Sequence, residues 1–433
     1  MIWKPEFECA DPADIRTLAG KRLRSLVEYV CANNPIYRKK LADAGVTPEK
    51  INSIADIVRL PVTVKDDLRD TYPFGLFCVP QKDVAEIHVS SGTTGNYTVV
   101  GYTKADLALW SDAVARSLAA SGANPGDRLQ VAYGYGLFTG GLGLHYGGLE
   151  MGLSVLPMSS GQTQRQLKLM QDFNCRVLAC TPSYALHMAE EAKELGFDFS
   201  QTKWKIGVFG AEPWSNAMRQ EIQDKWGLKA YDIYGLSEIS GPGVANECEY
   251  QDGLHIWWDV FYPEVLNPDT FEPVPEGEPG VLAITTLTKQ AIPLIRYVTR
   301  DVVTLNYAKC RCGRTCPRIG RVTGRTDDMI IVRGINVFPS QIEHALLKIE
   351  GTQPYYQLIV DRKAGGMDEL EVLVEVEQSF FSDKISKLEA LAATIRQKLH
   401  EALLVHVKVT LVEPKTIERS TGKSKRVIDR RKM

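Results

Sequence analysis

Two short stretches with the pattern or composition of strands lie on either side of a loop of small residues. The first, Val84–Val89, alternates with a period of two, which indicates a strand. The second, Thr98–Tyr102, has the composition of another short strand. Two strands joined in this way predict a hairpin with a polar, flexible tip. The tip consists of Ser90, Ser91, Gly92, Thr93, Thr94 and Gly95.

The middle of the chain repeats a strand followed by a helix, which predicts a parallel α/β sheet. The strands are expected over Val177–Ala179, Ile206–Phe209 and Ala230–Ile233. Ligands of such sheets bind beyond the carboxyl ends of the strands. Two polar segments follow strands at such ends, Gly210-Ala211-Glu212-Pro213 and Tyr234-Gly235-Leu236-Ser237-Glu238.

Three other segments are expected to be helical. Residues 14–45 carry an apolar stripe that Asn34 and Pro35 interrupt, and residues 104–120 follow the predicted hairpin. Thr63 is expected to cap a helix that starts two residues later.

The C-terminal part of the chain changes pattern twice. Gly253–Leu305 consists of short strands and turns, which predicts a β-rich subdomain. Beyond a polar joint at 324–328, a helical stripe and alternating strands predict a small α+β domain on a hinge. The fold class is therefore α/β. We expect a large N-terminal domain over residues 1–325, with parallel α/β sheets and the β-rich subdomain, and a mobile C-terminal domain over residues 326–433.

The composition indicates which binding partners and which cellular location to expect for this protein. Of 433 residues, 44% are hydrophobic and 24% charged, and the formal net charge is −2. Nothing in this balance indicates attraction to nucleic acid or to a membrane. The first residues lack the apolar segment of a signal peptide, so a cytoplasmic location is expected, with cysteines reduced or metal-bound. A homodimer is left open.

The loop at residues 90–95 is a candidate phosphate site. Glycine lets backbone N–H groups approach an anion, and the hydroxyls add donors, so polyphosphate is the obvious ligand. An ordinary surface turn has the same composition. The loop lacks the Gly-Lys-Ser/Thr ending of a Walker loop and does not open a helix.

A glycine-rich segment runs from Tyr133 to Gly152, and eight of its residues are glycine. Such a run is costly in an ordinary helix. It could be a helix whose small residues let a flat ligand lie against the backbone, or one packed closely on a sheet. On the first interpretation, Tyr135 and Phe138 would form an aromatic wall.

Cysteines cluster at Cys310, Cys312 and Cys316, and Cys248 and His255 lie some sixty residues upstream. Four thiolate or imidazole ligands make a closed tetrahedral zinc site. We expect Cys248, His255, Cys310 and Cys312 to bind a structural Zn²⁺, with Cys316 as the competitor of His255. The alternative is a set of ordinary reduced cysteines.

Five motifs in order resemble those of the adenylate-forming superfamily, which includes acyl-CoA synthetases and luciferases. The resemblance implies that Ser90–Gly95 binds phosphate and that Tyr234 stacks on adenine. It also implies that Glu238 holds Mg²⁺ and that Asp301 binds the ribose of ATP. Gly324–Pro339 matches the hinge motif, with Arg325 on ribose and Asp327 as the pivot. The catalytic lysine matches Lys423. The implied nucleotide-binding residues are Ser90, Ser91, Gly92, Thr93, Thr94, Gly95, Ala211, Glu212, Pro213, Tyr234, Gly235, Ser237, Glu238, Asp301 and Arg325.

Within that superfamily the chain resembles the phenylacetate–CoA ligases, in segments such as FGAEPW and GLSEISGPGVANEC. The resemblance implies that an aryl carboxylic acid and ATP give an acyl-adenylate, which coenzyme A converts to a thioester. The family commonly has Lys or Arg and Pro after the last loop glycine, where this chain has Asn96-Tyr97. Two alternatives remain at this stage: transfer of the acyl group to a carrier protein or amine, and a non-enzymatic nucleotide-binding regulatory or scaffold protein.

Overall fold

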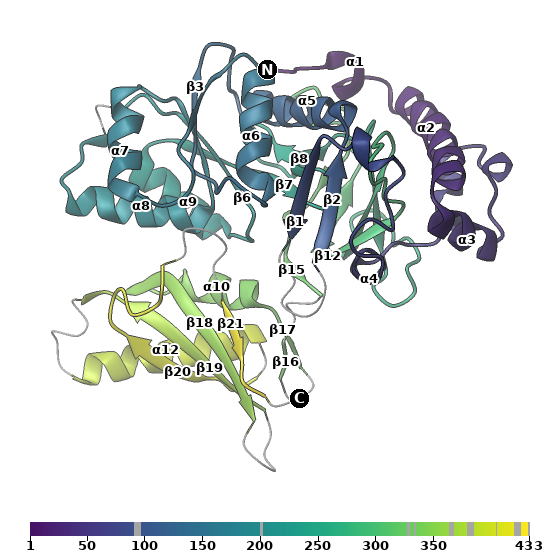
Figure 1. Cartoon of the computed structure of the whole chain (residues 1–433). Helices are drawn as coiled ribbons and strands as arrows, with labels where there is room; N and C mark the ends of the chain where they lie inside the picture. The colour runs from purple at the N-terminus through teal and green to yellow at the C-terminus, as the bar shows by residue number, and fades with distance from the viewer. Residues whose placement is uncertain are drawn as a thin grey trace. The chain divides into compact units, whose positions relative to one another are not determined.

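The computed structural model describes residues 1–90, 97–199, 202–326, 330–332, 335–362, 368–378, 385–403, 405–419 and 426–431. The chain forms two compact units (Figure 1). Unit 1 contains residues 1–180, 198–211 and 228–322, and unit 2 contains residues 181–197, 212–227 and 323–433. The predicted boundary between an N-terminal and a C-terminal domain at residue 325 remains a proposal.

A mixed sheet of nine strands organises unit 1. From one edge to the other its strands are β13 (Leu305–Asn306), β14 (Arg318–Ile319), β9 (Leu254–Ile256), β8 (Gly241–Glu247), β7 (Lys229–Leu236), β6 (Ile206–Gly210), β5 (Val177–Cys180), β3 (Arg128–Val131) and β4 (Ser154–Pro157).

The two halves of this sheet have different strand directions. From β4 to β7 all neighbours are parallel, which confirms the predicted parallel α/β sheet. From β7 to β13 they are antiparallel. The inner strands β5 and β6 of the parallel half are buried along their whole length, as expected where helices cover both faces. The chain after β7 returns directly beside it, so the polar turn after β7 lies where the sheet changes direction.

Two smaller sheets complete the strands of unit 1. The predicted hairpin is formed by β1 (Glu86–Ser90) and β2 (Thr98–Tyr102), which pair antiparallel with Ser90 opposite Thr98. The β-rich subdomain contains an antiparallel sheet of β10 (Phe261–Leu266), β11 (Gly280–Thr286) and β12 (Tyr297–Val303).

The helices of unit 1 follow the predicted pattern. Asn34 ends the first long helix and caps the next, because its side chain accepts the N–H groups of Ile36 and Tyr37. The α-helices are α1 (Pro5–Glu8), α2 (Pro12–Asn33), α3 (Pro35–Asp43), α4 (Lys65–Asp70), α5 (Lys104–Ala120), α6 (Thr139–Glu150) and α7 (Thr163–Asp172), and the 3₁₀ turns are η1 (Pro48–Lys50), η2 (Ile54–Arg59) and η3 (Gln81–Asp83).

The prediction that Thr63 caps a helix is wrong. The residue before α4 is Val64, whose N–H bonds to the carboxylate of Asp67. Thr63 instead donates its hydroxyl to the carbonyl of Ile295, and its backbone pairs with the start of β12. Pairing with a distant strand therefore decides the role of this side chain.

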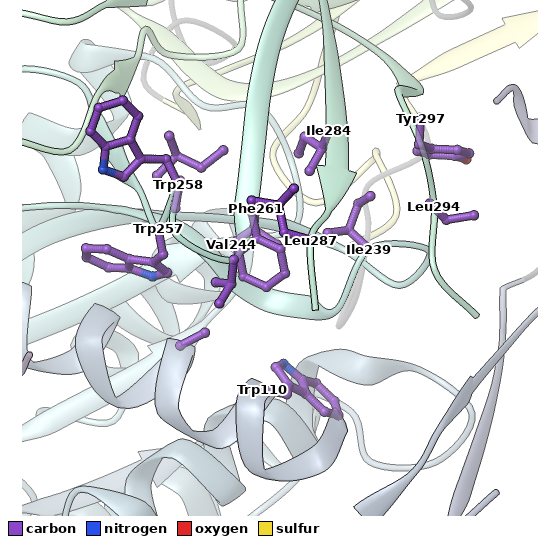
Figure 2. Close-up of a cluster of buried hydrophobic side chains, with 14 of the residues drawn as sticks. Trp110, Ile239, Val244, Trp257, Trp258, Phe261, Ile284, Leu287, Leu294 and Tyr297 are labelled. Atoms are coloured by element: carbon purple, nitrogen blue, oxygen red, sulfur yellow. The ribbon is translucent and has the colours of Figure 1, made fainter. Parts of the chain in front are cut away.

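A large aromatic and aliphatic cluster fills the centre of unit 1 (Figure 2). Trp110 from α5 and Ile239, which follows β7, are both fully buried in it. Because Ile239 stands directly after Glu238, burial of its side chain fixes the polar turn to the core. The other labelled members are Val244, Trp257, Trp258, Phe261, Ile284, Leu287, Leu294 and Tyr297.

Unit 2 has its own core and its own sheet, in the order β20-β19-β18-β21. The strands β18 and β19 are antiparallel, while β20 and β21 run parallel to their neighbours. The predicted helical stripe packs on this sheet through Leu391, Ile395 and Leu399. The elements of unit 2 are α8 (Pro182–Glu194), α9 (Asn216–Trp226), β15 (Gly324–Arg325), β16 (Ile330–Val332), β17 (Ile335–Val337), α10 (Pro339–Leu346), β18 (Thr352–Arg362), β19 (Asp368–Val376), α12 (Ile385–Leu403), β20 (Lys408–Val412) and β21 (Val427–Asp429).

Among the described residues, no helix combines the length and the hydropathy needed to cross a bilayer.

Candidate active site

The base of the nucleotide loop is the hairpin of β1 and β2. Ser90 ends β1, and Ser91, Gly92, Thr93, Thr94 and Gly95 lie outside the described residues, as does Asn96. The inward face of β1 is polar: His88 is 1% exposed, whereas Ile87 is 45% exposed. The strand that leads into the loop therefore directs polar side chains into unit 1.

Two of the predicted nucleotide residues meet although they are far apart in the sequence. Tyr234, near the end of β7, donates its hydroxyl to Oδ2 of Asp301 at 2.6 Å. Asp301 lies on β12 and is 6% exposed, and its backbone N–H bonds to the Thr299 hydroxyl. A hydrogen bond to an ionised carboxylate is short and strong, so each side chain orients the other.

The turn after β7 holds Ser237 and Glu238, both buried. The hydroxyl of Ser237 is 3.0 Å from that of Thr139, at the first residue of α6. Oε1 of Glu238 is 3.4 Å from Nζ of Lys65, the first residue of α4. The predicted metal-binding carboxylate is thus paired with a cation.

A second cation lies beneath the same turn. Nζ of Lys289 donates to the carbonyl oxygens of Ile239, at 2.7 Å, and Glu238, at 3.3 Å. It also lies 4.6 Å from the centre of the Tyr102 ring. Burial lowers the pKa of Lys289 to about 8, while the charges of Asp106 and Glu238 oppose that shift. This lysine holds the backbone of the turn in place.

Sequence reasoning missed Lys65 and Lys289. Lys65 stands in a run of charged residues typical of a solvated helix start. Lys289 had a usable signal, because it stands between apolar stretches in TTLTKQAIPLI, where a lysine needs buried partners.

The FGAEP segment follows β6. Gly210 ends the strand where an added Cβ would lie 2.2 Å from the carbonyl oxygen of Ile233, and Ala211 has a positive φ of 70°. Glu212 begins the next part of unit 2 and accepts the N–H of Ser183, in the first turn of α8, at 2.7 Å. Its carboxylate therefore caps a helix. Pro213 follows it in a segment without regular structure.

The aromatic candidates for the acid pocket stand on either side of Leu137. Tyr135 is half-buried, and its hydroxyl is 3.3 Å from Nδ1 of His145. Phe138 is 42% exposed at the start of α6. Both side chains come from one short segment between β3 and α6.

For two glycines of α6 the structure favours close packing over a ligand surface. An added Cβ at Gly143 would lie 2.4 Å from Cζ2 of Trp110, and one at Gly147 would lie 2.3 Å from Val114. Both neighbours belong to α5. These glycines are needed because α5 and α6 approach closely, so they leave no room for a flat ligand.

The predicted metal ligands come together. One ligand atom from each of Cys248, His255, Cys310 and Cys312 lies within 4.8 Å of the others. Sγ of Cys248 is 3.8 Å from Sγ of Cys310, and Sγ of Cys312 is 3.5 Å from Nε2 of His255. Sγ of Cys316 faces the other nitrogen of His255, at 3.5 Å from Nδ1.

The remaining predicted residues lie toward the C-terminus. Arg325 is half-buried in β15. Asp327 and Lys423 lie outside the described residues.

Comparison with known proteins agrees with these motifs. The family model of the AMP-binding enzyme matches residues 33–287, and that of the AMP-binding enzyme C-terminal domain matches residues 334–431. The phenylacetate-coenzyme A ligase of Thermus thermophilus is 50% identical over 100% of both chains. That of Escherichia coli is 47% identical over 98% of this chain and 97% of its own.

Solved structures agree as well. The 2-hydroxyisobutyryl-CoA ligase in the postadenylation state, in complex with 2-HIB-AMP, is 31% identical, with a TM-score of 0.92 over 98% of this chain and 91% of its own. The chain therefore belongs to the phenylacetate-coenzyme A ligase family of AMP-binding enzymes.

Proposed function

We propose that this chain is an AMP-forming ligase that joins an arylacetic acid, with phenylacetate as the first choice, to coenzyme A. The hydrogen bond between Tyr234 and Asp301 carries the proposal, because it brings the predicted adenine and ribose residues together. The name of the relatives at 47% and 50% identity supports the choice of acid.

The first half-reaction activates the acid. A carboxylate is a poor electrophile because its charge repels nucleophiles, so it needs a better leaving group. The carboxylate oxygen attacks the α-phosphorus of ATP, the bond to pyrophosphate breaks, and an acyl-adenylate forms. The protein orients the reactants and neutralises the charge that builds on the α-phosphate.

Three side chains are assigned to this step. Lys423 supplies a cation to the α-phosphate, an assignment that rests on the sequence motif. Glu238 would hold Mg²⁺, and its buried carboxylate fits a hard cation. Bound Mg²⁺ would neutralise phosphate charge. Lys65 lies 3.4 Å from Glu238, so it orients this carboxylate.

In the second half-reaction the sulfur of coenzyme A attacks the acyl carbon. The bond between the acyl carbon and AMP breaks, and a thioester is released. Asp327 is assigned as the pivot that lets the C-terminal domain change its position between the two steps, which often limits turnover in such enzymes.

The acid is assigned to the segment that carries Tyr135 and Phe138. Aromatic faces contact an aryl ring through dispersion and edge-to-face interactions. They supply no counter-charge for the carboxylate, which must face ATP. The enzyme should therefore prefer aryl acids with a short spacer over straight-chain fatty acids.

We also infer that Cys248, His255, Cys310 and Cys312 bind one structural Zn²⁺. At ordinary bond lengths in a tetrahedral zinc site, two thiolates lie about 3.8 Å apart and a thiolate and an imidazole nitrogen about 3.6 Å apart. The observed distances of 3.8 Å and 3.5 Å fit these values. Cys316 would accept a hydrogen bond from Nδ1 of His255 and orient the ring.

Other assignments follow from the sequence alone. A cytoplasmic location and a homodimer stay predictions. Asn96-Tyr97 replaces the usual cation and proline after the loop, so the affinity for ATP should depend more on Mg²⁺ and on Lys423.

One assay tests the reaction. AMP release is measured with phenylacetate, benzoate, indoleacetate and octanoate, each with and without coenzyme A. Steady AMP release that needs both phenylacetate and coenzyme A is expected. Acid-dependent exchange of pyrophosphate into ATP with no response to coenzyme A would indicate transfer to a carrier or amine instead. Faster use of octanoate than of phenylacetate would contradict the acid assignment.

A further inference from the structure

A hydrogen-bonded pair of a buried histidine and a half-buried glutamate lies on the strand that leads into the nucleotide loop. Nε2 of His88 is 2.6 Å from Oε1 of Glu86, two residues away on β1. Nδ1 of the same ring is 3.0 Å from the carbonyl oxygen of Leu137. Both partners are oxygen atoms that can accept a hydrogen bond, so the His88 ring lies between two acceptors, one on its own strand and one on the segment before α6.

The carboxylate has a second partner, on α6. Oε2 of Glu86 accepts the hydroxyl of Tyr146 at 2.8 Å. Burial alone would raise the pKa of Glu86, but the hydrogen bonds from His88 and Tyr146 lower it overall, so the carboxylate is ionised at neutral pH.

These bonds join β1 to the segment assigned to the acid. The Leu137 carbonyl accepts from the His88 ring and also from the backbone N–H of Val89, at 3.2 Å. Tyr135 and Phe138 lie on either side of this carbonyl. The rest of the His88 ring makes edge contacts with Tyr102 and Trp110, which fix its plane.

We propose that Glu86 and His88 form a clip that holds the acid-binding segment on β1, the strand that leads into the nucleotide loop, and that this clip makes the binding of acid and of nucleotide cooperative. The proposal rests on the proposed function, since it takes Tyr135 and Phe138 as the acid site. Both residues of the clip are positioning residues, because they act through the Leu137 carbonyl and through Tyr146. Hydrogen-bond networks between rigid elements can carry the energetic coupling between two binding sites.

The test measures one coupling factor by titration calorimetry. The dissociation constant of phenylacetate is determined with and without Mg²⁺ and α,β-methylene-ATP, which cannot be cleaved at the reacting bond. The coupling factor is the dissociation constant of phenylacetate without nucleotide divided by the constant with nucleotide. For the unmodified enzyme this ratio should be at least about 5, the low end of common coupling. In His88→Phe, which keeps a ring between Tyr102 and Trp110, the ratio should fall to about 1, with nucleotide affinity changed less than about threefold.

Further variants separate the clip from general damage. Glu86→Gln keeps the shape of the side chain but removes its charge. It tests the hydrogen bonds of the clip independently if His88→Phe folds poorly. Ile87→Val alters the exposed face of the same strand and should keep the coupling of the unmodified enzyme. Unchanged coupling in folded His88→Phe and Glu86→Gln would overturn the clip alone. Absence of phenylacetate-dependent pyrophosphate exchange in the unmodified enzyme would overturn the proposed function, and the clip with it.

Discussion

At the scale of single residues, the site is built from buried polar groups whose partners come from other segments. Tyr234 forms a hydrogen bond with Asp301, and Ser237 forms one with Thr139. Glu238 forms an ion pair with Lys65. A buried carboxylate without such a partner would be costly, because burial disfavours the charged form. Each pairing therefore keeps a polar group in place before ligands arrive.

Removal of the Tyr234 hydroxyl tests the pairing with Asp301. Tyr234→Phe keeps the ring that we assign to adenine but deletes a hydrogen bond to a charged group, worth about 1.5–3 kcal/mol. Part of that loss should reach ATP binding, so we expect KM for ATP to rise by roughly 3–30-fold with kcat nearly unchanged. Pyrophosphate exchange measures both constants. Tyr231→Phe on the same strand should leave KM for ATP unaltered, and an unaltered KM in Tyr234→Phe would refute the role.

Lys423 can be tested by separating the half-reactions. Lys423→Ala should slow acyl-adenylate formation by about 10²–10³, the usual loss for one group that stabilises developing charge. Thioester formation from supplied phenylacetyl-adenylate should remain. The first rate is followed by the release of pyrophosphate, and the second by chromatography of AMP and thioester. Lys425→Ala serves as the control, and equal damage to the two half-reactions would contradict the assignment.

At the scale of elements, close packing of α5 against α6 explains a glycine pattern that resembled a ligand surface. Trp110 is fully buried, and its Nε1 donates to the carbonyl of Pro242 at 3.0 Å, so its ring cannot move aside. Gly143 lies against that ring. The glycines thus set the spacing between the two helices.

Some glycines of α6 are tightly packed and others have room for a side chain, so substitution by alanine should have opposite effects on stability at the two kinds of position. Gly143→Ala places a Cβ 2.4 Å from Trp110, and such overpacking should destabilise unit 1 by about 1–3 kcal/mol. Gly140→Ala meets its nearest atom at 3.5 Å, an ordinary contact, and should stabilise the helix by roughly 0.5–1 kcal/mol. Thermal unfolding should show a lower Tm for the first variant and an equal or higher Tm for the second. A Gly143→Ala protein as stable as the parent would exclude this packing account.

The cysteine and histidine cluster joins separate elements of the β-rich part. Cys248 follows β8, His255 lies in β9, and Cys310 and Cys312 lie between β13 and β14. Arg314 extends the cluster, since it bonds to Sγ of Cys312 and, through Nε at 2.6 Å, to Glu8 of α1. Loss of a metal there should loosen several elements together.

Elemental analysis of protein purified without added metal should find one Zn²⁺ per chain. Stripping the metal should lower Tm, because formation of such a site is coupled to folding. Cys312→Ser should lose most of the zinc. Cys316→Ser, outside the four ligands, and Cys175→Ser, buried elsewhere, should keep one equivalent. A metal-free chain of unchanged stability would remove the site from this account.

At the scale of the whole molecule, two units share the motifs of one reaction. Unit 1 holds Tyr234, Glu238 and Asp301, while Arg325 and Lys423 belong to unit 2. On these sequence assignments, neither unit carries all five residues. A pivot would allow the same nucleotide-binding residues to take part first in adenylation and then in thioester formation.

The pivot can be tested at Asp327. Proline fixes φ near −65° and removes the N–H, so Asp327→Pro should block rotation at that residue. Adenylation should survive, while thioester formation should fall by at least about tenfold. Asp327→Ala, which leaves φ free, should keep both activities, and stopped assays of each half-reaction give the comparison. No effect of proline on either step would show that Asp327 is not the pivot.

The sequence by itself determined the elements and the chemistry. Alternation and helical stripes predicted the hairpin, the parallel strands β5 to β7 and the helix α12, because these patterns record which side of a local element is buried. Motif order identified the family and predicted the nucleotide residues, because each motif is a short local segment. The antiparallel half of the large sheet was not predicted, since the pairing of β8 with β7 depends on a turn rather than on periodicity.

Only the tertiary structure decided which residues meet. It turned the polar face of β1 inward, because Glu86 and the Leu137 carbonyl are partners of the buried His88 ring, and Tyr146 bonds to Glu86. It brought Lys289 beneath the turn at Glu238 from some fifty residues away. A local pattern contains no information about partners so distant along the chain, and a buried charge is stable only where the fold supplies them.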